Sequence, residues 1–156
     1  MTRIEAIAAV ARLLNVPESD LWLTGSQRYT SFFSDEAPMD ATHDVDILVR
    51  VDVNSWRAME KKRIALVELG ATDNSKAYDT EDMNLIVKLH GYSINLIILS
   101  VVKYDAWVAG TRAISWNWGP ELSENKEIRV QLFKAVRDAY LQGYAARQAV
   151  IENAAR

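Results

Sequence analysis

Residues 21–51 constrain the fold of this chain most, because two short apolar runs there flank a polar segment. The first run ends at Gly25-Ser26, and the second opens with Asp44 and Asp46 in the alternation D-V-D-I-L-V. Side chains two residues apart share one face of a β-strand, so this pattern predicts two carboxylates within about 7 Å of each other. One of them should have a raised pKa unless a cation lies between them. Oxygen ligands of this kind suit Mg²⁺ or Mn²⁺ better than Zn²⁺, which makes Asp44 and Asp46 candidate metal ligands.

The Gly25-Ser26 pair predicts a phosphate site beside these carboxylates. Glycine at the end of a strand lets a ligand approach the backbone closely. A short helix that begins near Ser26 would turn its free N–H groups and the positive end of its dipole toward that ligand. Arg28 could bind triphosphate oxygens or could be an ordinary surface charge, and both interpretations stay open. Gly25, Ser26 and Arg28 are therefore the candidate nucleotide-binding residues.

The order of strand, Gly-Ser, loop and Asp-x-Asp resembles the signature of the polymerase-beta nucleotidyltransferase superfamily. The similarity spans about residues 20–115 and points to small phage-encoded members, which the later run NLIIL…YDAWVAGTRA also resembles. The resemblance implies an α/β (α+β) fold: a mixed β-sheet with helices on one side and a C-terminal helical extension. It also implies a cytoplasmic enzyme, in the host cytoplasm if phage-encoded. That enzyme would use Mg²⁺ (or Mn²⁺) to move a nucleoside monophosphate from an NTP to an acceptor hydroxyl, with release of pyrophosphate.

The third catalytic position departs from that superfamily. Its members carry a third carboxylate on a later strand, which helps to hold the metal and takes the proton from the attacking hydroxyl, whereas the residue that aligns here is Asn95. An amide offers only a neutral carbonyl oxygen and cannot act as a base. Catalysis would then need an acid supplied by the acceptor, or Asp79, Glu81 or Asp82 from the preceding loop. The alternative is a catalytically impaired module that binds nucleotide, nucleic acid or a host protein.

Composition limits the remaining possibilities. The 156 residues predict one domain, with a core over about 20–115 and a helical tail over about 120–156. A net charge of −3 argues against a dedicated nucleic-acid coat, and the absence of cysteine excludes disulfides and thiolate catalysis. Without a long apolar run the chain is expected to be soluble and to have no membrane partner. The expected partners are an NTP, an RNA, nucleotide or protein acceptor, and a second copy or a host protein.

Hydrophobic periodicity predicts the elements. Helices are expected at about 3–15, 55–69, 104–115 and from about 124 to the C-terminus, with fraying after Tyr144. Strands are expected at 21–24, 44–51, 83–90 and 93–100, with a weaker one at 71–77 and a two-residue connection at Gly91-Tyr92. The long segment 27–43 is either a solvated acidic insertion with exposed Phe32 and Phe33 or an active-site lid.

Overall fold

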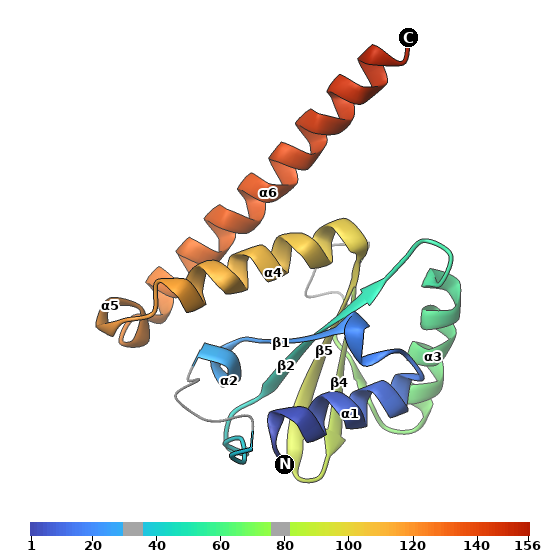
Figure 1. The fold of residues 1–156 in the computed structure, drawn as a ribbon. Coiled ribbons are helices and arrows are strands. Elements are labelled where there is room, and N and C mark those ends of the chain that lie inside the picture. Colours follow the sequence, from blue (N-terminus) through green and yellow to red (C-terminus); the bar gives the residue numbers. More distant parts are fainter. Residues whose placement is uncertain (30–35, 76–81) are drawn as a thin grey trace. The chain divides into compact units, whose positions relative to one another are not determined.

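The computed structural model describes residues 1–29, 36–75 and 82–156, and the chain forms two compact units, Met1–Val101 and Val102–Arg156 (Figure 1). The first unit contains a β-sheet with helices, and the second consists of helices. The predicted Phe32 and Phe33, and Asp79 and Glu81, lie outside the described residues.

A mixed sheet forms the centre of the first unit. Its strands are β1 (Leu21–Thr24), β2 (Val45–Val51), β3 (Thr72–Asp73), β4 (Met83–Leu89) and β5 (Tyr92–Ser100). They lie in the order β1-β2-β5-β4-β3. β2 and β5 pair in parallel at the centre, whereas the other neighbouring strands are antiparallel. The two central strands are mainly apolar in sequence, which is typical of parallel strands in the interior of a sheet.

Two helices cover one face of this sheet. The helical segments of the unit are α1 (Arg3–Leu14), the 3₁₀ turn η1 (Glu18–Asp20), α2 (Ser26–Tyr29) and α3 (Trp56–Glu68). Apolar side chains of α1 and α3 share one buried cluster with alternate residues of β2 and β5; they include Ala6, Val10, Leu14, Met59, Val45, Ile47, Val49, Ile94, Leu96 and Ile98. The predicted mixed sheet with helices on one side is confirmed for this unit.

The predicted start of the first helix is confirmed in detail. The Thr2 side chain accepts a hydrogen bond from the Glu5 backbone N–H at 3.1 Å, which satisfies one of the free donors of the first turn. The helix ends at Leu14, and Asn15 adopts a left-handed conformation with a φ of 52°. Asparagine tolerates that conformation better than most residues, so it replaces the more usual glycine as the helix stop.

The connection between β4 and β5 differs by one residue from the prediction. The two turn residues are His90 and Gly91, with φ of 51° and 80°, whereas Tyr92 pairs with Leu89 as the first residue of β5. A type I′ hairpin requires positive φ at both central positions, and glycine and histidine tolerate it better than tyrosine does. The Tyr92 hydroxyl also donates to the Met39 carbonyl at 2.8 Å, which fixes this residue inside the sheet.

The second unit is helical. It comprises α4 (Val101–Trp116, whose first residue belongs to the first unit), α5 (Pro120–Ser123) and α6 (Lys126–Ala154). α4 and α6 approach closely at Gly110, where an added Cβ would lie 2.6 Å from the Phe133 ring. The rings of Phe133 and Trp107 meet edge to face with centroids 4.9 Å apart.

The helical extension that the sequence predicts is confirmed. α6 continues without a break to Ala154, beyond the predicted fraying point at Tyr144. In the described ranges, no helix combines the length and the apolar character needed to cross a membrane.

Candidate active site

The junction of β1 and α2 shapes one side of the candidate site. β1 ends at Thr24, Gly25 has a φ of 72°, and α2 begins at the exposed Ser26. A Cβ on Gly25 would overlap Oδ2 of Asp46 and would lie 3.1 Å from Cγ of Asp46. Glycine at this position therefore makes room for the Asp46 carboxylate, in addition to any room that it leaves for a ligand.

Asp46 lies between two neighbouring strands. It pairs with Thr24 of β1 and, in the parallel register, with Asn95 of β5. Asn95 Nδ2 donates to Asp46 Oδ1 at 3.1 Å. Burial raises the pKa of Asp46 to about 6; the hydrogen bond from Asn95 opposes this shift, and the negative charge of Asp44 adds to it. The carboxylate is thus in a place where its negative charge is poorly compensated by the protein alone.

Asp44 is close to Asp46 but in a different environment. It directly precedes β2 and is exposed, whereas Asp46 is the second residue of the strand. The negative charge of Asp44 contributes to the raised pKa of Asp46, although burial contributes more. Within the described ranges no group of three or more Asp, Glu, His or Cys side chains is arranged to hold a metal ion. Asp44 and Asp46 are therefore a pair without a third acidic partner in that part of the chain.

The position of Asn95 depends on a residue that the sequence analysis missed. Asn84 of β4 is completely buried, and its Nδ2 donates to Asn95 Oδ1 and, at 3.1 Å, to the Leu96 carbonyl. Asn84, Asn95 and Asp46 thus form a continuous chain of hydrogen bonds across three strands. The signal in the sequence was an asparagine inside the apolar strand M-N-L-I-V-K-L, since a buried amide needs hydrogen-bond partners.

Arg28 lies against β1. Its guanidinium carbon is 3.9 Å from the centroid of the Trp22 ring, and Nη1 donates to the Leu23 carbonyl at 3.2 Å. In the register of β1 with β2, Trp22 pairs with Leu48 two residues beyond the Thr24–Asp46 pair. Trp22 therefore projects from the same face of the sheet as Asp46, and the stacked Arg28 supplies positive charge on that face.

Gln27 is a second residue that the sequence analysis missed. Its side chain is buried, and Nε2 donates to the backbone carbonyls of Asp40 at 2.7 Å and His43 at 3.3 Å. These bonds tie α2 to the segment that leads into Asp44. Hydrogen bonds from Thr42 hold the pKa of Asp40 below its usual value, and Asp40 also pairs with His43 Nε2 at 3.5 Å. The backbone before Asp44 is therefore restrained.

A hollow of about 500 Å³ adjoins this junction. Ser26, Gln27, Arg3 and the segment 37–40 with His43 line it. It brings the hydroxyl of Ser26 together with one guanidinium and one imidazole. None of the residues of the Asn84–Asn95–Asp46 chain lines it, so Ser26 is the candidate nucleotide-binding residue that it shares with the site.

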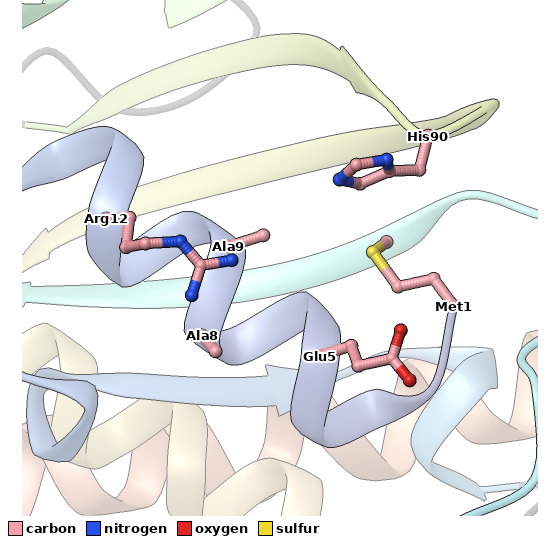
Figure 2. Close-up of a pocket in the computed structure, with 6 residues that line it drawn as sticks. All are labelled: Met1, Glu5, Ala8, Ala9, Arg12 and His90. Atoms are coloured by element: carbon pink, nitrogen blue, oxygen red, sulfur yellow. The ribbon is translucent and has the colours of Figure 1, made fainter.

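A second hollow, of about 410 Å³, lies elsewhere. Figure 2 shows His90 of the β4–β5 turn on one side of it, and Glu5 and Arg12 of α1 with Met1 on the other. None of the predicted site residues contributes to it.

Of the alternative acids from the sequence analysis, Asp82 is described and half-buried, directly before β4.

The comparisons with known proteins bear on the fold of the chain and not on its activity. No family model matches the chain, and no curated protein matches it. Among solved structures, the chain is similar to the conserved protein GrpB from Enterococcus faecalis, with 12% identity over 90% of this chain and 91% of that one and a TM-score of 0.52. The small alarmone synthetase 1 from Bacillus subtilis matches with 9% identity, coverage of 99% of this chain and 77% of that one, and a TM-score of 0.33. The five-stranded mixed sheet, its helices on one face and the helical extension are compatible with a nucleotidyltransferase-like fold.

Proposed function

We propose that this protein transfers a nucleoside monophosphate from an NTP to an acceptor hydroxyl, with a divalent cation held by Asp44 and Asp46. The observation that carries the proposal is the environment of Asp46. Its carboxylate is partly buried beside Gly25 and Asn95, and its pKa is raised to about 6. A cation at this carboxylate would supply the charge compensation that the surrounding residues do not give.

The donor set fits Mg²⁺ or Mn²⁺. Mg²⁺ in nucleotide enzymes is commonly held by one or two carboxylates together with substrate phosphate oxygens and water. The described residues offer two carboxylates and no larger acidic cluster, which matches such a shared site better than a closed protein cage. A cation bound there would neutralise charge on the phosphates as pyrophosphate leaves.

The neighbouring residues would bind the rest of the nucleotide. Ser26 is exposed at the start of α2, directly after the glycine that contacts Asp46, and it also lines the 500 Å³ hollow. Phosphates next to Asp46 would lie within reach of the positive charge of Arg28, which projects over the same face of the sheet. The oxygen of the acceptor would form the new bond to the α-phosphorus as the bond to pyrophosphate breaks.

No carboxylate of the described residues occupies the position of a third acid. Asn95 cannot accept the proton of the attacking hydroxyl, so that proton would pass to water or to an ionised carboxylate of the acceptor. The rate enhancement would then come from positioning and charge neutralisation. The impaired module that binds NTP without turnover is the second candidate, and Asn95 is the observation in its favour.

The test is transfer of label from α-labelled NTPs to RNA, nucleotide and protein acceptors, with Mg²⁺ or Mn²⁺. We expect labelled acceptor and pyrophosphate with wild type, and loss of both in Asp44→Asn and Asp46→Asn. The matched control is Asp52→Asn, because Asp52 follows the opposite end of β2, about 20 Å from Asp46 at a rise of ~3.3 Å per residue. Asparagine also keeps the oxygen that caps the Ser55 N–H.

Two results would count against the proposal in different ways. NTP binding that requires the cation, without transfer to any acceptor, would favour the impaired binding module. Equal Mn²⁺ affinity in wild type and in the Asp44→Asn/Asp46→Asn double variant would show that these carboxylates do not hold the cation at all.

A further inference from the structure

Asn84 and Asn95 form a hydrogen-bonded pair with a defined direction. Asn84 Nδ2 donates both to Asn95 Oδ1 and to the Leu96 carbonyl, and Asn95 Nδ2 donates to Asp46 Oδ1. An amide carries its donors on one end and its acceptor on the other. Turning Asn84 over would place its oxygen against two acceptors, so the direction of the whole chain is set at Asn84.

This arrangement leaves the buried side-chain oxygen of Asn84, Oδ1, without a hydrogen-bond donor among the residues that the structure describes. A buried acceptor without a donor is unfavourable, and an apolar side chain of similar size would avoid the problem. The orphaned oxygen therefore indicates that the donor end of Asn84 has a use beyond filling the core.

That use concerns the side of Asn95 that faces Asp46. Because its carbonyl oxygen is taken by Asn84, Asn95 presents an NH₂ group to the carboxylate. The hydrogens of that group repel a cation but hold one carboxylate oxygen in place, which leaves Oδ2 of Asp46, the oxygen nearest to Gly25, for a cation.

We propose that Asn84 and Asn95 are positioning residues that act as one unit, with Asn84 setting the direction of Asn95 and Asn95 orienting Asp46 for the cation. Asn95 is then a hydrogen-bond donor to the ligand of the cation and not itself a ligand. The inference rests on the proposed function only in taking Asp46 as a cation ligand, and it requires no turnover.

The first test is a double-mutant cycle on Mn²⁺ affinity, measured by calorimetry, with thermal unfolding of each protein in parallel. Loss of such an orienting partner commonly costs 10–100-fold in metal affinity, so we expect Asn84→Leu to weaken Mn²⁺ binding about tenfold. Asn95→Leu should weaken it at least as much. In the Asn95→Leu background Asn84→Leu should have no further effect, because Asn84 reaches Asp46 only through Asn95.

A matched control is Ser93→Ala, on the same face of β5 as Asn95 and two residues away, where the side chain pairs opposite Lys88. This variant should leave Mn²⁺ affinity unchanged. A purely structural role of Asn84 would lower the unfolding temperature without this coupling. Additive effects of the two substitutions, or unchanged affinity in Asn84→Leu, would overturn the proposal.

The second test needs no substitution at either asparagine, and so it holds even if Asn84→Leu does not fold. In ¹⁵N-labelled wild type the side-chain NH₂ of Asn95 should give signals of a group bonded to a carboxylate, both without and with Mg²⁺. A switch of these signals to those of an unbonded amide on addition of Mg²⁺ would show that Asn95 turns its oxygen to the cation, which contradicts the proposal.

The outcomes also separate this inference from the proposed function. If the protein shows no NTP turnover but the effects of Asn84→Leu and Asn95→Leu on Mn²⁺ affinity are coupled, the proposed enzyme activity is wrong and the positioning role of the two asparagines stands. If turnover is normal but the two effects are additive, the enzyme activity stands and the positioning role is wrong. Failure of wild type to bind Mn²⁺ would overturn both.

Discussion

Replacing Asp46 by Asn is expected to raise the free energy of unfolding of the cation-free protein by about 2–3 kcal/mol at about pH 8. The variant keeps an oxygen that can accept from Asn95 Nδ2, and it removes a charge whose burial raises the pKa of Asp46 from 3.8 to about 6. A shift of about two pKa units corresponds to ~3 kcal/mol between the protonated and ionised forms. Urea unfolding of both proteins in the presence of a chelator measures the difference.

The same substitution has a defined pH dependence. The pKa of Asp46 is higher in the folded protein than in the unfolded chain, so the stability linked to its proton is fully present below the unfolded value of 3.8. As the pH rises toward about 6, the unfolded chain loses this proton first, and wild-type stability falls. Asp46→Asn has no such proton. The extra stability of the variant over wild type should therefore be absent near pH 3.8 and complete above about pH 6.

Asp44→Asn is the matched control for this experiment. Asp44 is exposed, and substitutions at exposed positions usually change stability by less than about 0.5 kcal/mol. Added Mn²⁺ should make wild type more stable than Asp46→Asn at high pH, because only wild type is stabilised by binding the cation. If Asp46→Asn were less stable than wild type without a cation, the buried carboxylate would already be compensated by the protein.

Gly25→Ala is expected to destabilise the fold by about 2–5 kcal/mol, for two separable reasons. The φ of 72° is unfavourable for any residue with a Cβ, and that Cβ would overlap the Asp46 carboxylate. Gly91→Ala isolates the first reason, since Gly91 has a φ of 80° and open space around its missing Cβ. We expect that control to cost only about 1–2 kcal/mol.

A double-mutant cycle measures the second reason. In an Asp46→Ala background the overlapping carboxylate is absent, so Gly25→Ala should cost no more than Gly91→Ala does. The interaction energy between positions 25 and 46 is therefore expected to be at least about 1 kcal/mol. If Gly25→Ala lowers the free energy of unfolding equally in both backgrounds, Gly25 is needed only for its backbone conformation. The close approach to its backbone would then matter for a ligand and not for Asp46.

Local patterns in the sequence predicted most of the element boundaries. β1 was predicted without error, and β2, β4 and β5 each to within one residue, because their apolar runs are bounded by polar residues or turns. The face of Asn95 was also predictable from alternation, and the parallel register does place it beside Asp46. The hairpin was misplaced by one residue, because Tyr92 is anchored by long-range hydrogen bonds that no local pattern contains.

A raised pKa at one of the two aspartates was predicted from their closeness, but the sequence did not show that Asp46 is the one affected or that burial is the main cause. Alternation shows which face a side chain occupies, but not how deeply that end of the strand is covered. Asp44 lies outside β2 and Asp46 inside it, so burial separates two residues that look equivalent in the sequence. The roles of Asn84 and Gln27 were equally hidden, since each contacts backbone or side chains 11 to 16 residues away.

The parallel pairing of β2 and β5 also has a kinetic consequence. Asp46 and Asn95 are 49 residues apart in the chain, whereas Asn84 and Asn95 belong to one hairpin and are 11 apart. Closing the longer segment costs more chain entropy, so the hairpin is expected to form before the central pair. The half of the site that carries the two amides would then exist before the half that carries the carboxylate. Cation affinity should therefore be acquired during refolding only when β2 joins β5.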